Sequence, residues 1–280
     1  MSAEVSVGIV AKAGNEPASE LAGVLASCVR SMGTTVRVDE RTGASLGRQG
    51  VPVGALSSAD LVVSIGGDGT FLFVARKVGG TPVVGVNLGE VGFLNAVSPT
   101  DAEDVVRSLV EVLQDGSLSV TYLDRLQASG DDWSLAPALN DVVVQGARRG
   151  PAGGGRFDVS VDGSHYHTIR GDGLIVSTPT GSTAYNRSEG GPLVAPDAAV
   201  QVITGMSPIE TVPPLVVEKS ATVTIDVSDC ETAAVVGDGR ETRRLTPPET
   251  VTVEEAAEPV RRAGPTIDFY AALSKIHETP

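Results

Sequence analysis

The sequence has little lysine, few aromatic residues and few cationic side chains. Lysine occurs only at positions 12, 77, 219 and 275, and aromatic residues make up 4% of the 280 residues. Asp and Glu number 35 against 21 Lys and Arg, so the formal net charge is −14. Because proteins bind polyanions through an excess of Lys and Arg, this balance argues against nucleic acid or an anionic membrane as a partner.

Acid-rich, lysine-poor composition resembles that of proteins from high-salt cytoplasms, such as those of halophilic archaea. The Debye length is only ~3 Å at 1 M salt, so dense negative charge is screened there. An ordinary acidic bacterial enzyme is the alternative interpretation. The sequence therefore raises the question of salt dependence without answering it.

Long apolar runs and paired cysteines are also missing. No segment approaches the ~18–20 apolar residues of a membrane span, and no charged and then apolar leader begins the chain, so we expect a cytoplasmic protein. Cys28 and Cys230 lie far apart and form neither a CxxC pair nor a disulfide framework. His165, His167 and His277 have no metal-ligand spacing with either cysteine.

The sequence pattern changes once along the chain, from alternating strands and helices to short strands. Apolar runs at 5–10, 61–65 and 83–86 alternate with helical patterns at 18–32 and 71–77, which is the rhythm of a parallel α/β sheet. Glycine and polar residues at 43–54 predict a mobile surface loop or lid. Thr100 followed by Glu103 predicts a capped helix start.

From residue 118 the pattern changes to short strands, the first expected over 120–126. Asp162-Gly163 and Asp238-Gly239 suit tight hairpin turns. We therefore predict an α/β N-terminal domain with a parallel sheet over residues 1–116 and an all-β, β-sandwich C-terminal domain over 117–265. A helix at 266–280 is expected to pack back on the first domain.

The sharpest motif is Ile-Gly-Gly-Asp-Gly-Thr at residues 65–70, between a predicted strand and a predicted helix. Its glycines, Gly66, Gly67 and Gly69, let backbone N–H groups approach a phosphate, and the helix N-terminus adds partial positive charge. A bound phosphate would repel the Asp68 carboxylate unless the carboxylate accepts a proton or helps to hold a metal ion. The simplest interpretation is that Asp68 acts as a general base. The alternative is a tight turn in which Asp68 only caps the helix.

A hydroxyl-rich stretch follows a strand at 172–188, Asp-Gly-Leu-Ile-Val-Ser-Thr-Pro-Thr-Gly-Ser-Thr-Ala-Tyr-Asn-Arg-Ser. Many small donors and acceptors suit a purine edge and ribose hydroxyls, and Tyr185 adds a stacking or hydroxyl contact. A Ser/Thr turn that satisfies its own backbone, with Tyr185 in the core, is the alternative. Asn140-Asp141 opens another strand and offers further polar groups, although such a pair is also a common turn signal.

Together, GGDGT, the Asn-acidic pair and the DGLIVSTPTGSTAY stretch resemble the NAD kinase family, as does the loop at 87–94, Asn-Leu-Gly-Glu-Val-Gly-Phe-Leu. The resemblance implies a two-domain enzyme that transfers the γ-phosphoryl group of ATP to the 2′-hydroxyl of the adenosine ribose of NAD. Asp68 would accept the proton, and Mg²⁺ or another divalent cation, held mainly by the ATP phosphates, would neutralise the transferring group.

The resemblance also implies the binding residues. The donor phosphates would contact Gly66, Gly67, Gly69 and Thr70, and NAD would contact Asp68, Gly69, Asn140, Asp141, Arg170, Asp172, Thr183, Ala184, Tyr185 and Ser188. A homodimer or homotetramer is expected. The metal ligands from the protein stay unassigned.

Two positions depart from the family pattern. Asp141 stands where the family often has Glu, and Arg240 follows Asp238-Gly239 where the family often has Gln, which leaves the preference for NAD or NADH and the phosphoryl donor open. A lipid kinase of the diacylglycerol type shares the GGDGT loop, and phosphofructokinases carry a modified form of it. The alternative to a kinase of any kind is a protein that binds the nucleotide as a sensor and catalyses no reaction.

Overall fold

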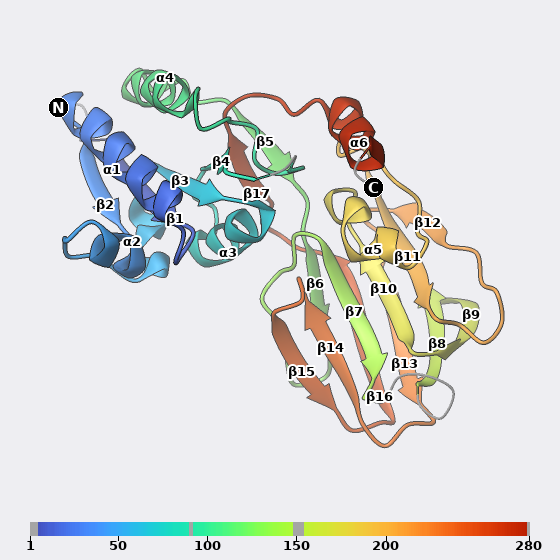
Figure 1. Ribbon diagram of the computed structural model, residues 1–280. Coiled ribbons are helices and arrows are strands. Elements are labelled where there is room, and N and C mark those ends of the chain that lie inside the picture. Colours follow the sequence, from blue (N-terminus) through green and yellow to red (C-terminus); the bar gives the residue numbers. More distant parts are fainter. Residues whose placement is uncertain (1–4, 90–91, 148–153, 279–280) are drawn as a thin grey trace. The chain divides into compact units, whose positions relative to one another are not determined.

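The computed structural model describes residues 5–89, 92–147 and 154–278. The chain folds as two compact units, one formed by Met1–Leu123 with Val260–Pro280 and the other by Asp124–Pro259 (Figure 1). Glu90 and Val91 of the NAD kinase-like loop lie outside the described residues. Within the described ranges, no helix is long and apolar enough to cross a membrane.

The first unit contains a six-stranded sheet in the order β2-β1-β3-β4-β17-β5. The first four of these strands in sequence are parallel, whereas β17 runs parallel to β4 and antiparallel to β5. The strands are β1 (Ser6–Ala11), β2 (Thr35–Val38), β3 (Leu61–Gly66), β4 (Val83–Asn87), β5 (Val120–Leu123) and β17 (Val260–Ala263). The helices are α1 (Glu16–Ser31), α2 (Glu40–Ser45), α3 (Asp68–Val78), α4 (Ala102–Gln114) and α6 (Phe269–Glu278), with the 3₁₀ helix η1 (Val53–Ser58).

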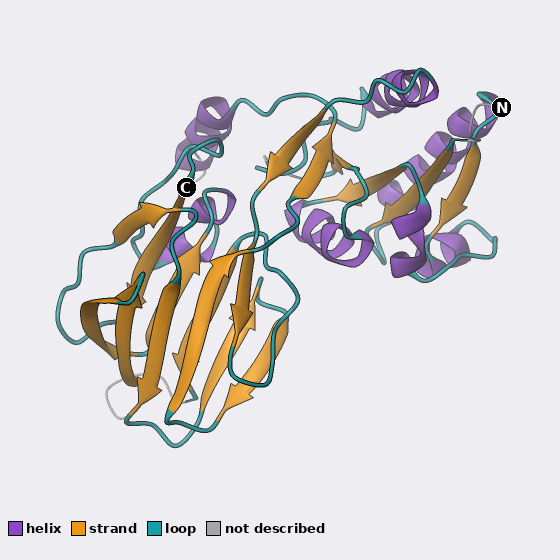
Figure 2. Ribbon diagram, turned by 180° about the vertical axis from the view of Figure 1, so that it is seen from behind, coloured by secondary structure: helices purple, strands orange, loops and turns teal. Residues whose placement is uncertain are grey.

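Helix α1 shows why these segments fold as they do. Asn15 caps it by accepting a hydrogen bond from the Ala18 N–H (2.9 Å). Its side chains at helical spacing, including Leu25 and Val29, are fully buried against Ile9 and Val63 of the sheet. Burial of each such aliphatic side chain contributes about 1.5–3 kcal/mol, so the apolar stripe fixes the helix on the sheet. Figure 2 shows the helices of this unit beside its strands.

Two local predictions for the first unit need correction. The loop predicted over 43–54 is shorter in the structure, because residues 43–45 belong to α2 and residues 53–54 to η1, and its mobility stays a prediction. The buried Thr42 hydroxyl accepts from the Ala11 N–H (2.8 Å) and so ties α2 to β1. Helix α4 begins at Ala102 after Asp101, and Glu103 forms an ion pair with Arg107 (3.1 Å) instead of a capping box with Thr100.

The second unit consists of two antiparallel sheets, ordered β12-β11-β10-β7-β14-β15 and β6-β16-β13-β8-β9. Its strands are β6 (Leu126–Ser129), β7 (Asp141–Gly146), β8 (Gly155–Val161), β9 (Ser164–Gly171), β10 (Gly173–Ser177), β11 (Val200–Met206), β12 (Leu215–Glu218), β13 (Val223–Ser228), β14 (Ala233–Gly237), β15 (Glu241–Leu245) and β16 (Glu249–Glu255). Between β10 and β11 lie the 3₁₀ helix η2 (Thr180–Thr183) and the short helix α5 (Tyr185–Ser188).

One core joins these two sheets. Phe157 and Ile225 of the smaller sheet belong to the same buried cluster as Val144, Leu174 and Val235 of the larger one. Both sheets therefore present alternate side chains to a shared interior, as in a sandwich. The predicted fold class, an α/β domain with a parallel sheet followed by a domain of antiparallel sheets, is confirmed.

Both predicted hairpins are present. Asp162 and Gly163 have φ of 49° and 76° between β8 and β9, and Asp238 and Gly239 have φ of 49° and 64° between β14 and β15. Two consecutive positive φ values are the geometry of a type I′ turn, which matches the twist of the strands it joins.

The predicted strand over 120–126 is divided between the units. Residues 120–123 form β5 of the first sheet, and β6 begins at Leu126 in the second unit. Alternation alone cannot show this division, because both halves have the same pattern. Helix α6 follows β17, and the Phe269 ring centroid lies 5.8 Å from that of Phe93.

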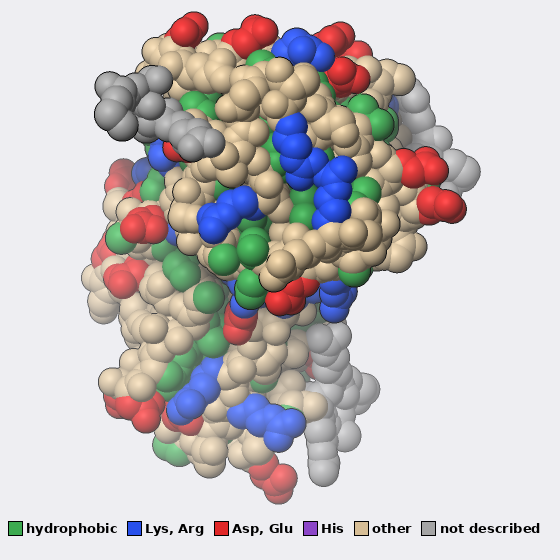
Figure 3. All heavy atoms as spheres, turned by 90° about the vertical axis from the view of Figure 1, so that its left-hand side faces the viewer, with side chains coloured by type: hydrophobic (Ala, Val, Ile, Leu, Met, Phe, Trp, Pro, Cys, Tyr) green, Lys and Arg blue, Asp and Glu red, His purple; other side chains and the backbone are tan. Residues whose placement is uncertain are grey.

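Figure 3 shows one face of the molecule with its charged side chains. On this face Asp and Glu are spread around the surface, and Lys and Arg lie among them singly or in small groups. No broad basic stripe crosses the surface in this view, in agreement with the charge balance of the sequence.

Candidate functional site

The GGDG turn joins β3 to α3 in the first unit. Gly67 is the N-cap and Asp68 is the first helical residue, so the carboxylate lies where the helix dipole is positive. A Cβ on Gly66 would come within 2.4 Å of the Thr70 hydroxyl oxygen. Only glycine therefore allows the Thr70 side chain to fold back over the turn.

Three donors hold the half-buried Asp68 carboxylate. Oδ2 accepts from the Phe93 N–H (2.8 Å), and Oδ1 accepts from the Leu94 N–H (3.2 Å) and from the Asn95 side-chain amide (2.8 Å). A Cβ on Gly92 would lie 2.4 Å from Oδ1, so this loop packs directly on the carboxylate. An ionised carboxylate has about four acceptor positions, so the three donors among the described residues leave room for one more.

Lys12 is a residue near this turn that the motifs alone did not indicate. It follows β1 directly, its N–H donates to the Ile65 carbonyl (2.8 Å), and its Cβ lies 3.2 Å from the position that a Gly66 Cβ would take. The residue is exposed. The sequence could have indicated Lys12 because lysine is rare in this chain: it is one of four lysines, and it follows a strand that pairs with β3.

In the second unit, Asn140-Asp141 and the Ser/Thr turn meet at one end of the larger sheet. Ser177, the last residue of β10, pairs with Asp141, the first residue of β7. The Thr178 hydroxyl donates to the Leu139 carbonyl (2.6 Å), and the Thr178 N–H donates to the Asn140 carbonyl (2.9 Å). Two of the three sequence motifs are thus hydrogen-bonded to each other.

The Ser/Thr turn is rigid. A Cβ on Gly181 would fall 1.9 Å from the Asn140 carbonyl oxygen, so the two backbones touch. The buried Asn186 side-chain amide donates to the carbonyls of Ser182 (3.3 Å) and Pro192 (3.0 Å) and accepts from Thr204 (2.7 Å). These bonds hold α5 against η2, the segment that follows it, and β11.

The predicted NAD contacts in this turn are accessible to different degrees. Thr183, Ala184 and Tyr185 are half-buried and Ser188 is exposed. Tyr185 packs against a small cluster that includes Val143 and Ile175, outside the sandwich core. The interpretation in which Tyr185 is a core residue is therefore confirmed only for this smaller cluster, because the ring is partly buried.

Asp141 is a buried carboxyl, 5% exposed. Burial, and then the negative charge of Asp238, raise the pKa of Asp141 from 3.8 to about 7. The first strand residue of β7 therefore titrates near neutrality, which the sequence did not indicate.

Asp172 lies at the other end of β10, directly before Gly173, and Arg170 lies two residues earlier, in β9 of the smaller sheet. Asp172 comes before β10, and its carbonyl accepts from the Gly146 N–H (3.0 Å) at the end of β7. At about 3.3 Å per residue, the four steps from Gly173 to Ser177 separate them from the Asn140 end by roughly 13 Å. Within one chain, the structure does not bring these two predicted residues together with Asn140.

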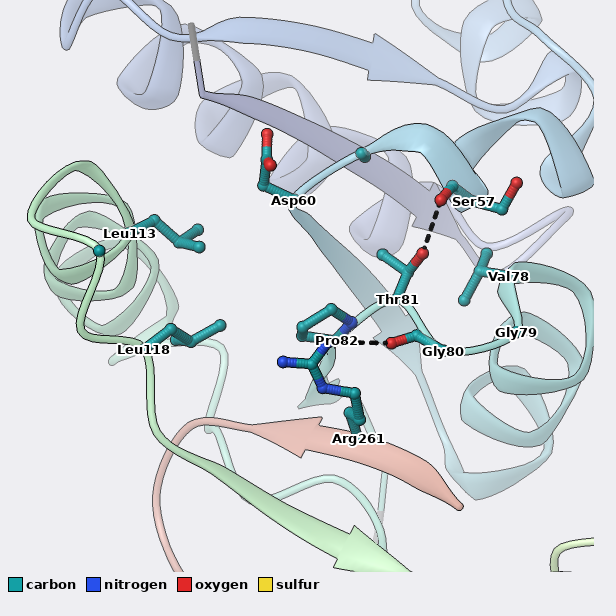
Figure 4. A pocket seen from close by; sticks show the side chains of 12 residues that line it. Ser57, Asp60, Val78, Gly79, Gly80, Thr81, Pro82, Leu113, Leu118 and Arg261 are labelled. Atoms are coloured by element: carbon teal, nitrogen blue, oxygen red, sulfur yellow. Dashed lines mark hydrogen bonds between the residues drawn. The ribbon is translucent and has the colours of Figure 1, made fainter. Parts of the chain in front are cut away.

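A cavity of about 680 Å³ lies at the N-terminal ends of β3 and β4, opposite the end of β3 that carries the GGDG turn (Figure 4). Asp60 and Pro82, which line it, immediately precede β3 and β4, whereas the GGDG turn follows β3. None of the predicted site residues lines this cavity.

The sequence leaves the metal ligands unassigned. Across the described residues, no group of three or more His, Cys, Asp and Glu side chains is arranged to hold a metal ion. Mg²⁺ is usually held by one or two carboxylates together with substrate phosphates. One carboxylate, Asp68, beside a glycine turn fits an ion that arrives with ATP.

Comparison with known proteins gives the family. The model of the ATP-NAD kinase N-terminal domain matches residues 7–114, and that of the C-terminal domain matches residues 139–263. The chain is 50% identical to the NAD kinase of Haloarcula marismortui over 97% of its length and all of that protein, and 50% identical to the NAD kinase of Halorubrum lacusprofundi with the same coverage.

Solved structures agree with this match. The crystal structure of an NAD kinase from Archaeoglobus fulgidus in complex with ATP superposes with a TM-score of 0.80 at 25% identity, covering 99% of this chain and all of that one. Yeast NADH kinase complexed with NADH shares the fold, with a TM-score of 0.83 at 21% identity over 99% of this chain and 87% of that one. Both domain models, the full-length relatives and the shared architecture show that the chain belongs to the ATP-NAD kinase family.

Proposed function

We propose that the protein is an NAD kinase, which transfers the γ-phosphoryl group of ATP to the 2′-hydroxyl of the adenosine ribose of NAD and so forms NADP. The observation that carries this proposal is the Asp68 carboxylate, held at a helix N-terminus among glycines, to which the described residues give three of about four possible donors. A site of this kind combines a proton acceptor with backbone N–H groups suited to phosphate.

Asp68 is the general base in this proposal. Its three donors fix both oxygens, so the carboxylate does not have to be oriented when the substrate arrives. It accepts the proton of the ribose 2′-hydroxyl as the oxygen attacks the γ-phosphorus and the bond to the leaving phosphate breaks. Gly69, the next residue, is exposed and offers its backbone to the same substrate.

The donor phosphates lie on the turn formed by Gly66, Gly67, Gly69 and Thr70. Lys12 adds a positive charge beside Gly66, in a chain that carries few lysines. When bound with ATP, Mg²⁺ neutralises charge on the transferring phosphoryl group. The ATP phosphates would hold most of this ion's ligand positions, because Asp68 is the proton acceptor for the ribose hydroxyl.

NAD contacts the joined motifs of the second unit. Asn140 and Asp141 offer an amide and a carboxyl at the start of β7, and Thr183, Ala184, Tyr185 and Ser188 line the neighbouring turn. Because Asp141 has a pKa of about 7, it is partly protonated at neutral pH and then donates as well as accepts.

A homo-oligomer fits the separation of the predicted NAD contacts. Asp172 lies roughly 13 Å along β10 from the Asn140 end, and Arg170 lies two residues before it in β9. In a homo-oligomer, these residues of one copy would contact the nucleotide held at the Asn140 end of another copy; an extended NAD that spans this distance within one chain is the alternative. Light scattering with and without NAD, on the wild type and on Arg170→Ala, tests this arrangement, and a monomer that turns over normally contradicts it.

The experiment that tests the function is NADP formation from NAD, ATP and Mg²⁺ by purified wild-type protein and by Asp68→Asn. Asp60→Asn is the matched control, because Asp60 precedes β3 as Asp68 follows it and accepts hydrogen bonds from Ser6 (2.8 and 3.0 Å), away from the GGDG turn. NADP made by the wild type and by Asp60→Asn but not by Asp68→Asn supports the proposal. Bound NAD without any NADP supports a nucleotide sensor instead.

A further inference from the structure

Asp238 lies in the turn between β14 and β15, nearly a hundred residues from Asn140, yet it holds the Asn140 segment. Its Oδ2 accepts from the Leu139 N–H (2.9 Å), and its Oδ1 accepts from the N–H groups of Asn140 (2.7 Å) and Asp141 (3.4 Å). The Asp238 N–H donates back to the Asp141 carbonyl (3.0 Å). Four hydrogen bonds thus join one turn residue to three consecutive residues.

The same segment is held from its other side by Thr178. The carbonyls of Leu139 and Asn140 accept from the Thr178 hydroxyl and N–H (2.6 and 2.9 Å), while the N–H groups of Leu139 and Asn140 donate to Asp238. With both sides of its backbone occupied, the segment has a single orientation. The direction in which the Asn140 side chain leaves the backbone is therefore set by Asp238 and Thr178.

Charge makes the Asp238 contacts strong. Hydrogen bonds from N–H groups to an ionised carboxylate are about twice as strong as those between neutral groups. The side chain is half-buried, and the charged groups that act on or near it are the Asp141 carboxyl and the Arg125 guanidinium. Asp238 thus lies beside a second carboxyl, and its own oxygens are used by the backbone of the Leu139–Asp141 segment.

We propose that Asp238 is a positioning residue for NAD: it orients Asn140, through the backbone of the Leu139–Asp141 segment, toward the nucleotide. The inference rests on the proposed NAD kinase function. The inference adds Asp238 to the NAD site as a residue that does not touch the nucleotide itself and acts on it through Asn140 and Asp141.

Asp238→Asn tests the inference. Asparagine tolerates the positive φ of 49° and keeps the volume, but it presents one oxygen instead of two to three N–H groups. The expected result is a rise of about tenfold in the KM for NAD, with the KM for ATP within about twofold of wild type, since tenfold corresponds to the loss of about one charge-assisted hydrogen bond.

Asp162→Asn is a closely matched control. Asp162 has the same φ of 49°, is followed by glycine in the same type of turn, and accepts from the Thr222 N–H (2.9 Å), but it lies between β8 and β9. If Asp162→Asn and Asp238→Asn change both KM values alike, Asp238 has a general structural role and the inference is wrong. It is also wrong if Asp238→Asn leaves the KM for NAD unchanged.

A double-mutant cycle with Asn140→Ala separates positioning from folding. If Asp238 acts through Asn140, adding Asp238→Asn to Asn140→Ala raises the KM for NAD little further, whereas independent effects multiply. If Asp238→Asn does not fold, Asp238→Glu replaces it as the test variant, because glutamate keeps the carboxylate. Its KM for NAD is expected to rise without a matching rise in the KM for ATP. A wild type that makes no NADP refutes the proposed function, whereas an active wild type with an unaffected Asp238→Asn refutes only this inference.

Discussion

Two carboxylates, Asp68 in the first unit and Asp238 in the second, have similar surroundings but differ in what remains free. Each accepts from consecutive backbone N–H groups of a distant segment, at Phe93 and Leu94 in one case and at residues 139–141 in the other. Asp68 begins a helix beside the exposed Gly69, whereas Asp238 lies in a hairpin turn next to a buried carboxyl. In our proposals, the same arrangement of hydrogen bonds prepares Asp68 to react, whereas at Asp238 it orients the neighbouring Asn140.

The largest effect is expected at Asp68. Removing a general base typically lowers turnover by a factor of about 10²–10⁴, so Asp68→Asn should reduce kcat by at least about 100-fold while NAD still binds. Asp238→Asn should instead change the KM for NAD and leave kcat nearly unchanged. Steady-state kinetics of both variants distinguish the two roles, and a similar loss of kcat in both would remove the distinction.

Asp141 is expected to make stability depend on pH. Its pKa is about 7 in the folded protein and near 3.8 when unfolded, so the folded state binds more protons between these values. The free energy of unfolding then falls as pH rises from about 4 to about 7, on the order of a few kcal/mol from this group, and levels off above that range. Urea unfolding at several pH values should show that Asp141→Asn lacks this component.

The pH comparison has its own control. Asp162→Asn, at an exposed turn, should keep the wild-type pH dependence. The free energy of unfolding could instead change with pH equally in wild type and in Asp141→Asn between pH 4 and 7. That result would show that Asp141 is ionised in the folded protein and would contradict this prediction.

Lys12 is expected to bind the donor rather than NAD. Lys12→Met should raise the KM for ATP about tenfold, since a charged hydrogen bond to a phosphate contributes roughly 1.5–3 kcal/mol. Lys77→Met is the matched control, because Lys77 is also exposed but lies in the last turn of α3, at the other end from Asp68. Equal ATP kinetics in the two variants would exclude Lys12 from the phosphate site.

Salt should have the smallest and broadest effect. With a net charge of −14, the folded chain repels itself in dilute buffer, and molar KCl screens that repulsion. Activity and thermal stability of the wild type are therefore expected to rise from about 0.1 to about 2 M KCl, in parallel for wild type and Lys77→Met. Loss of activity on adding salt would contradict the interpretation of the composition.

Local signals in the sequence predicted what local interactions determine. Both Asp-Gly turns have the expected positive φ values, and α1 begins near its predicted start because Asn15 caps it. The ends of the loop predicted over 43–54 were misplaced for the opposite reason. Helix α2 has no apolar period, and its Thr42 is held by β1, more than 30 residues earlier.

The candidate site shows the same limit. The GGDG turn and the Ser/Thr turn were visible as motifs because their glycines and hydroxyls are consecutive. What holds them was not visible, since the partners of Asp68 lie 25 to 27 residues away and those of Asp238 97 to 99 residues away. Lys12 and Asp238 became recognisable only when strands from distant parts of the chain were placed side by side.

The strand order of the first sheet has a consequence for biosynthesis. Strand β5 joins that sheet only through β17, and β17 is translated after the whole second unit. During translation, β1 to β4 are able to pair early, whereas the free edge of β4 waits for residues 260–263 to leave the ribosome. An exposed strand edge is a template for pairing with other chains. Ribosomes stalled before residue 260 should therefore carry a nascent chain that aggregates more readily than the finished protein.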